Sequence, residues 1–307
     1  MSELFTRNAA NPVLTSADWP YEVNTVFNPG VARVDEGVLL LARVEDRAGV
    51  SHLAVATSEN GVTDWQIDPA RALLPDLESE AERHGIEDPR ITRVGDEWLI
   101  LYTGYSSSGP LVCLAATRDF RHYERRGVIL SPEDKDAALF PERIGERYVL
   151  IHRPVTAARD HADIWLASSP DLIHWATQGI LLPAGEGASW EARKIGLGPP
   201  PLRTPEGWLI AYHGVKTTAA GAIYRIGLAL LDLEQPAVIL ARTRSWVFGP
   251  QEPYERSGDV DNVVFPCGWL LDHDGDTIQM YYGAADTSIC LATASLAALL
   301  ERLRRER

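Results

Sequence analysis

Apolar residues recur along this chain in short runs separated by compact polar segments. Five segments have the order strand, polar turn, strand, because runs rich in Val, Ile, Leu and aromatic residues flank turn-forming residues such as VDEG, VGDE and TPEG. They span Asn28–Val44, Asp88–Gly104, Phe140–Pro154, Gly198–Gly214 and Phe265–Gly283. A further β-rich run follows in most of them, such as SHLAVATS after the first and SICLATAS after the last. The pattern predicts antiparallel sheets of successive strands.

These segments form an internal repeat. A proline near the start of each one recurs at intervals of 52 to 65 residues, at Pro29, Pro89, Pro141, Pro201 and Pro266. Five units of about 60 residues with about four strands each predict an all-β, five-bladed β-propeller. A pair of β-sandwiches is the alternative, but it does not predict five repeats. Neither a linker nor a shift in composition divides the chain, so we expect residues 1–307 to form a single domain.

Helical periodicity is confined to two places. The C-terminal segment Ser295–Arg307 has an apolar face formed by Leu296, Leu299, Leu300 and Leu303. This face predicts a short helix that packs on the outside of the propeller. Residues 76–84 are interpreted as a short helix or a loop.

The propeller fold predicts where polar side chains from distant segments meet. The innermost strand of each blade lines a central funnel, so residues near the start of these strands converge on one axial site. The converging segments carry many charged and polar residues: Asn28, Arg43, Asp46, Arg47, Glu87, Asp88, Arg90, Arg143, His152, Arg153, Glu191, Arg193, Lys194, His213, Tyr224, Asp259, Asp261, Asn262 and Asp286. Buried strands carry so many charges only when these are paired or functional. Carboxylates, arginines and aromatic rings around one pocket suit a carbohydrate.

Charge narrows the range of partners. The chain has 29 Lys and Arg residues against 43 Asp and Glu residues, a formal net charge of −14. An acidic chain without a basic run in its body is a poor partner for nucleic acid or an anionic membrane. Only three of the basic residues are lysines, namely Lys135, Lys194 and Lys216. An anionic ligand would therefore need a local cluster of cations inside a negative protein.

Other features indicate an ordinary soluble protein. Cys113, Cys267 and Cys290 lie in apolar segments without metal-ligand spacing, which favours small buried side chains in a reducing compartment. The N-terminal residues lack a secretory signal pattern, and no apolar run approaches the roughly 20 residues of a membrane helix. We therefore expect a cytoplasmic protein, with homo-oligomerisation left open.

Six motifs in order resemble glycoside hydrolase family 130. They are IEDPRI (Ile86–Ile91), FPERIGERYVLIHRP (Phe140–Pro154), WEARKIGLGPPP (Trp190–Pro201), YRIG (Tyr224–Gly227), GDVDNVVFPCG (Gly258–Gly268) and YYGAAD (Tyr281–Asp286). The resemblance covers essentially the whole chain. This family comprises inverting β-mannoside phosphorylases and some β-mannosidases on a five-bladed propeller.

The resemblance implies roles for particular positions. Asp88 of the EDPR motif matches the family's general acid, which is thought to act through the 3-hydroxyl of the bound mannose. Asn28, Arg43 and Asp286 match positions that bind mannose, and Arg90 and His213 are further candidates for sugar contact. The implied phosphate-binding residues are Arg47, Arg143, Arg153, Lys194, Tyr224 and His152.

These residue types suit phosphorolysis. Phosphate is already a nucleophile, so an inverting phosphorylase can dispense with the second carboxylate that activates water in a hydrolase. It must instead neutralise a dianion next to the anomeric carbon, which calls for Arg and Lys side chains. The expected reaction takes a β-mannoside and inorganic phosphate as co-substrate to α-mannose 1-phosphate, without a cofactor or metal. Neither the linkage nor the acceptor sugar can be determined from the sequence.

Two other functions remain open. An inverting β-mannosidase would need a carboxylate base opposite Asp88, for which Glu191 and Asp261 are the candidates. A non-catalytic sugar-binding propeller would not need Asp88 at all.

Overall fold

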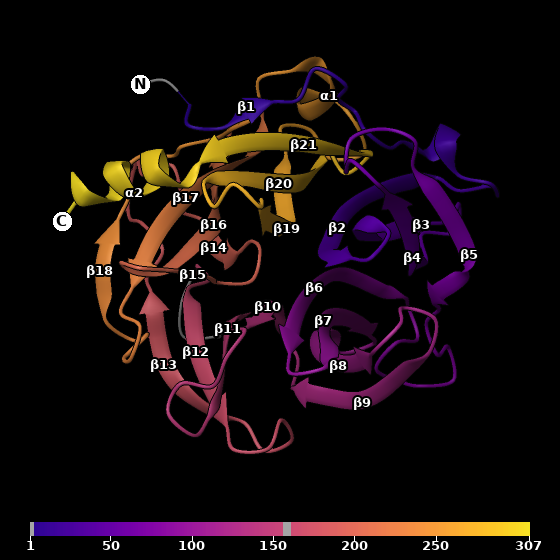
Figure 1. The fold of residues 1–307 in the computed structure, drawn as a ribbon, viewed down its shortest axis with the longest axis horizontal. Coiled ribbons are helices and arrows are strands. Elements are labelled where there is room, and N and C mark those ends of the chain that lie inside the picture. The colour runs from indigo at the N-terminus through magenta and orange to yellow at the C-terminus, as the bar shows by residue number, and fades with distance from the viewer. Residues whose placement is uncertain (1–2, 156–160) are drawn as a thin grey trace.

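The computed structural model describes residues 3–155 and 161–307 as five antiparallel sheets, the blades, arranged around a central axis (Figure 1). Blade 1 consists of β2 (Thr25–Val34), β3 (Gly37–Glu45), β4 (Ser51–Ser58) and β5 (Gln66–Leu73). Blade 2 consists of β6 (Ile86–Val94), β7 (Glu97–Ser106), β8 (Gly109–Thr117) and β9 (Tyr123–Leu130). Blade 3 consists of β10 (Asp134–Leu139), β11 (Tyr148–Pro154), β12 (Ile164–Ser169) and β13 (Ala176–Leu182).

The last two blades vary this scheme. In blade 4, β14 (Lys194–Leu197) and β15 (Leu202–Thr204) both pair with β16 (Gly207–Thr218), which is followed by β17 (Gly221–Leu231) and β18 (Ile239–Arg242). Blade 5 consists of β19 (Val264–Leu271), β20 (Thr277–Ala284) and β21 (Ser288–Ser295), with the N-terminal β1 (Thr6–Arg7) as its outer strand. Since β1 pairs with β21, hydrogen bonds join the two ends of the chain and cover a sheet edge.

The predicted five-bladed propeller is confirmed. The predicted C-terminal helix is also confirmed as α2 (Leu296–Arg304), whose buried residues are Leu296, Leu299, Leu300 and Leu303. Residues 76–84 form turns, so the loop alternative is correct there. The remaining helical elements are η1 (Ser16–Asp18) and α1 (Pro253–Arg256). Among the described residues, no helix is both long and apolar enough to cross a membrane.

One strand prediction is wrong. The sequence repeat places the first strand of the third unit after Phe140, whereas the innermost strand of blade 3 is β10, which ends at Leu139. The error arises because Pro141 is not equivalent to Pro29 and Pro89. In β2 and β6 the proline lies inside the innermost strand, whereas Pro141 follows its end.

Irregularities in three innermost strands orient the axial side chains. The pairing register shifts between Phe27 and Gly30 in β2, between Glu87 and Arg90 in β6, and between Lys135 and Ala138 in β10. Asn28, Asp88 and Asp136 lie at these shifts with φ values of 44°, 50° and 55°. Asn and Asp tolerate this left-handed conformation better than most residues, and a bulge redirects a side chain. The three polar side chains thereby reach the axis.

Candidate active site

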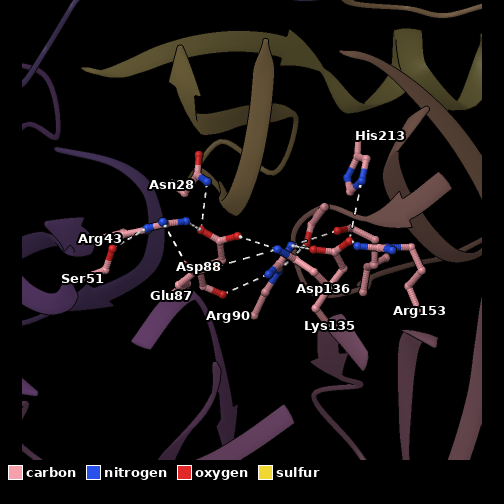
Figure 2. A network of polar contacts seen from close by, with 12 residues as sticks. Asn28, Arg43, Ser51, Glu87, Asp88, Arg90, Lys135, Asp136, Arg153 and His213 are labelled. Carbon is pink, nitrogen blue, oxygen red and sulfur yellow. Dashed lines mark hydrogen bonds and ion pairs between the residues drawn. The ribbon is translucent and has the colours of Figure 1, made fainter. Parts of the chain in front are cut away.

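A pocket lies where the innermost strands begin, and all five blades contribute to it. Its lining residues are Asn28, Arg43, Asp88, Lys135, Asp136, Arg153, Lys194, His213, Tyr224, Val260, Val263, Phe265 and Asp286. Most of them are polar or charged. Figure 2 shows that the polar network runs from Arg43 and Asp88 on one side to Asp136, Arg153 and His213 on the other.

Asp88 is the most enclosed carboxylate on the first side, at 2% exposure. Asn28 Nδ2 donates a hydrogen bond to its Oδ1 over 2.9 Å, and Arg43 Nη1 donates to the same oxygen over 3.3 Å. Lys135 Nζ lies 4.0 Å from Oδ2. Burial disfavours the charged form, but Arg43, Lys135, Arg90 and the Asn28 hydrogen bond outweigh it and lower the pKa of Asp88. The carboxylate is therefore ionised in the ligand-free site.

Arg43 is held from several directions. Its Nη2 lies 3.1 Å from both Glu45 and Glu87, and its Nε donates to Ser51 Oγ over 2.9 Å. The guanidinium also lies over the Phe27 ring, 4.5 Å from its centroid. These contacts fix the orientation of the Arg43 guanidinium that binds Asp88.

Basic side chains gather around Asp136 on the other side of the pocket. Arg153 Nε lies 2.7 Å from Asp136 Oδ2, Arg90 Nη2 lies 3.4 Å from Oδ1, and His213 Nε2 lies 3.6 Å from Oδ2. Burial alone would raise the pKa of Asp136, but Arg153 and the other surrounding cations lower it. One carboxylate thus faces Arg153, Arg90 and Lys135, which leaves this side with excess positive charge.

Lys194 adds to that excess. Its Nζ lies 5.3 Å from the centroid of the Tyr224 ring, and no described carboxylate forms an ion pair with it. Burial and the nearby Arg153 charge lower the pKa of Lys194 to about 8. Burial also lowers the pKa of His213 to about 3, so its imidazole is neutral. A dianion placed here would relieve the repulsion among these cations.

Asp286 completes the side that contains Asp88. It lies in the tight turn between β20 and β21, with a φ of 51°, and no described residue donates a hydrogen bond to its carboxylate. Burial and the charge of Asp88 raise the pKa of Asp286 to about 7. The Asp286 carboxyl group is therefore available to accept a hydrogen bond from a sugar hydroxyl, or to donate one to it, beside Asp88.

Replacing Asp286 with Asn should therefore stabilise the ligand-free protein at high pH. Because the pKa of Asp286 is higher in the folded protein than in the unfolded chain, the free energy of unfolding decreases as the pH rises from the unfolded value, near 4, through 7. We expect the variant to have a Tm a few degrees higher than the wild type at pH 8 and a much smaller difference at pH 5. Thermal unfolding at the two pH values tests this. An equal difference at both would contradict the assigned titration.

The structure brings most of the predicted site residues together. Those that line the pocket are Asn28, Arg43, Asp88, Arg153, Lys194, His213, Tyr224 and Asp286. His213 was predicted as a sugar contact and lies on the cation side, next to Asp136.

Two predicted phosphate-binding arginines lie elsewhere. Arg47 is 75% exposed and pairs with Glu22 over 2.7 Å. Arg143 donates to the backbone oxygens of Glu146 and Pro170 and stacks on Tyr148, in the turn at the other end of β11. Neither lines the pocket, so their assignment to a phosphate site is not supported.

Two other predicted residues lie behind the pocket wall. Arg90 is 1% exposed and donates to the backbone oxygens of Asp88, Leu197 and Gly198, so it supports the pocket floor instead of contacting a sugar. His152 is buried against Asp134, with Nδ1 and Oδ2 2.6 Å apart. It does not line the pocket, because successive residues of β11 point to opposite faces of the sheet.

Lys135 and Asp136 were missed in the sequence. The misplaced start of blade 3 hid both of them, although Lys135 is one of only three lysines in an arginine-rich chain. The rarity of lysine in this chain was the signal that could have identified Lys135 as a site residue. Glu191 and Asp261, the carboxylates considered as a hydrolytic base, are not among the residues that line the pocket. Glu191 pairs with Arg242, and Asp261 accepts a hydrogen bond from the Gly258 N–H. Within residues 3–155 and 161–307, no three His, Cys, Asp or Glu side chains cluster as a metal site would.

Similarity to known proteins agrees with this geometry. The sequence matches the glycoside hydrolase family 130 description, β-1,4-mannooligosaccharide phosphorylase, over residues 6–305. It is 36% identical to a 1,2-β-oligomannan phosphorylase of Thermoanaerobacter sp. (strain X514), covering 93% of this chain and 95% of the other. It is 31% identical to a β-1,4-mannooligosaccharide phosphorylase of Ruminococcus albus, covering 94% and 88%.

A solved structure shows the same fold. The β-1,2-mannobiose phosphorylase of Listeria innocua, in complex with β-1,2-mannobiose, superposes with a TM-score of 0.90 at 32% identity, over 98% of this chain and 99% of the other. The fold and pocket are thus those of a propeller carbohydrate enzyme. The chain belongs to glycoside hydrolase family 130.

Proposed function

We propose that this protein is an inverting phosphorylase that cleaves the terminal β-mannosidic bond of a mannosyl disaccharide or manno-oligosaccharide with inorganic phosphate. The observation that carries the proposal is the cation cluster of Lys135, Arg153 and Lys194, which lines the same pocket as Asp88. Relatives of this chain are named phosphorylases of both β-1,2- and β-1,4-mannosides, so the proposal covers both linkages.

In this reaction the bond between the anomeric carbon and the acceptor oxygen breaks while a phosphate oxygen bonds to the same carbon from the opposite face. The leaving oxygen takes up a proton, and the sugar departs as α-mannose 1-phosphate. The cation cluster positions the nucleophile and stabilises its charge. Asp88 supplies the proton that the leaving oxygen takes up, directly or through a sugar hydroxyl. A cofactor or metal has no part in this scheme, in which phosphate is the co-substrate.

Asp88 must hold a proton before it can act as an acid, yet it is ionised in the ligand-free site. Lys135 connects the two sides, because it lies near Asp88 and Glu87 while lining the phosphate pocket. Bound phosphate offsets the Lys135 charge that lowers the Asp88 pKa, and therefore raises that pKa. Phosphate binding thus prepares Asp88 for proton transfer, directly or through a sugar hydroxyl.

The test compares product formation with and without phosphate. Purified protein is incubated with β-1,2- and β-1,4-mannobiose and with mannosyl-glucose, and mannose 1-phosphate and free mannose are quantified. We expect mannose 1-phosphate only when phosphate is present. Free mannose released at the same rate in phosphate-free buffer would establish hydrolysis instead. Sugar binding without either product would leave the non-catalytic alternative.

The proposal predicts a pH dependence that originates in Lys194. Because its pKa is about 8, kcat/KM for phosphate should fall as the pH rises above about 8 and the ammonium loses its charge. Lys194→Arg should move this fall to higher pH, because the guanidinium remains protonated. Initial rates at varied phosphate from pH 6.5 to 9.5 measure the effect. An unchanged profile in the variant would assign the fall to another group.

A further inference from the structure

A buried carboxylate–imidazole pair lies directly behind the cation cluster. Asp134 is 4% exposed and His152 is 2% exposed, and their Oδ2 and Nδ1 atoms are 2.6 Å apart. The other polar atom of each side chain, Asp134 Oδ1 and His152 Nε2, has no hydrogen-bond partner among the described residues. Burying such groups costs stability that an apolar pair would not lose. Fold stability therefore does not account for this dyad.

The dyad adjoins two phosphate-site cations in the sequence. Asp134 precedes Lys135 on β10, and His152 precedes Arg153 on β11. Lys135 and Arg153 are direct pairing partners, so their side chains lie on the same face of the sheet, towards the pocket. His152 points to the opposite face, where Leu150 packs with Leu99 and Leu101 of blade 2. The dyad thus supports the cation pair from behind.

Backbone pairing at this end of β10 is short. Beyond the bulge, the paired residues of β10 and β11 are Asp134–Pro154 and Lys135–Arg153. The Val155 N–H also donates to the Glu133 oxygen over 2.9 Å, which makes Asp134–Pro154 the non-hydrogen-bonded pair of this ladder. The Asp134–His152 contact is a side-chain tie across the same strands. It adds a side-chain contact to the short ladder that presents Lys135.

We propose that Asp134 and His152 form a positioning pair that fixes the spacing of Lys135 and Arg153, and thereby sets the affinity for phosphate. This inference rests on the proposed function, because it assigns phosphate to the pocket. The two residues do not touch the phosphate. They act through the strand register that holds the two cations at one spacing.

The test replaces the pair with apolar residues, in Asp134→Val/His152→Leu, and measures the Kd for inorganic phosphate by calorimetry. We expect phosphate to bind about tenfold more weakly, equivalent to about 1.4 kcal/mol. KM for the mannoside should stay within about twofold and Tm should not fall, because an apolar pair replaces a costly polar one. A merely structural pair would instead lower Tm and leave the phosphate Kd unchanged.

Tyr282→Phe serves as the matched control. This substitution removes the buried 2.7 Å hydrogen bond that Tyr282 of blade 5 donates to Glu255 of α1. The bond lies away from the phosphate cluster, so the phosphate Kd should stay unchanged. Should the double variant not fold, Asp134→Ser breaks the tie and leaves room for water, and it must show the same selective loss. Wild-type phosphate affinity in either folded variant would overturn the positioning role. Absence of mannose 1-phosphate from the wild-type reaction would instead overturn the proposed function.

Discussion

Replacing Asp88 with Asn should lower kcat for phosphorolysis by about 10³-fold, within the range that general acid catalysis contributes. An amide cannot carry the proton that the leaving oxygen needs, yet it retains the shape of the carboxylate. Arg43 keeps its contacts with Glu45, Glu87 and Ser51, so the pocket wall should stay in place. Initial rates of mannose 1-phosphate formation, with calorimetric binding of mannose, measure the effect.

Glu87→Gln is the matched control for this result. Glu87 precedes Asp88 and contacts the same Arg43 and Lys135, but it does not line the pocket. Glu87→Gln should lower kcat far less than Asp88→Asn does. Asp88→Asn that retained more than a tenth of the wild-type rate would contradict the assigned role. Comparable losses in both variants would indicate a general effect of charge removal.

Replacing Lys194 with Met should weaken phosphate binding on the order of 100-fold, the scale for removing one partner of a desolvated charge pair. Met retains most of the length and apolar stem of Lys but has no charge. In the ligand-free protein the Lys194 ammonium is disfavoured by burial and by Arg153, so its loss should not lower Tm. Mannose binding should be nearly unchanged, because the contacts of Asp88 lie on the other side of the pocket. Phosphate titration and thermal unfolding test both parts.

The chain offers a matched lysine for comparison. Lys216 lies outside the pocket, and its Nζ donates to the backbone oxygen of Ala188. Lys216→Met removes the same charge from the same acidic protein, so phosphate affinity should stay within about twofold if local contacts dominate. Equal weakening by both substitutions would mean that net charge, and not the pocket, attracts phosphate.

Much of the molecule could be predicted from local patterns. The strand and turn periodicity is sufficient for the propeller, because every blade is made from consecutive segments. Asn28, Asp88 and Asp286 were found through the family resemblance, and all three adopt positive φ values, a requirement that Asn and Asp meet with little strain. The N-terminal β1 in the last blade was not predicted, since two residues carry too little pattern to define a strand.

The sequence by itself determined the blade repeat, the concentration of charge near the innermost strands and the family resemblance, because each is a local property of consecutive residues. Only the tertiary structure decided which charges face the axis. His152 and Arg153 are adjacent, yet one lies behind the sheet and the other lines the pocket. The bulge in β10 brings Lys135 and Asp136 to the site, whereas Arg47 and Arg143 remain in exposed turns. A shift of one residue in a strand exchanges its two faces, and such shifts are settled by packing between blades.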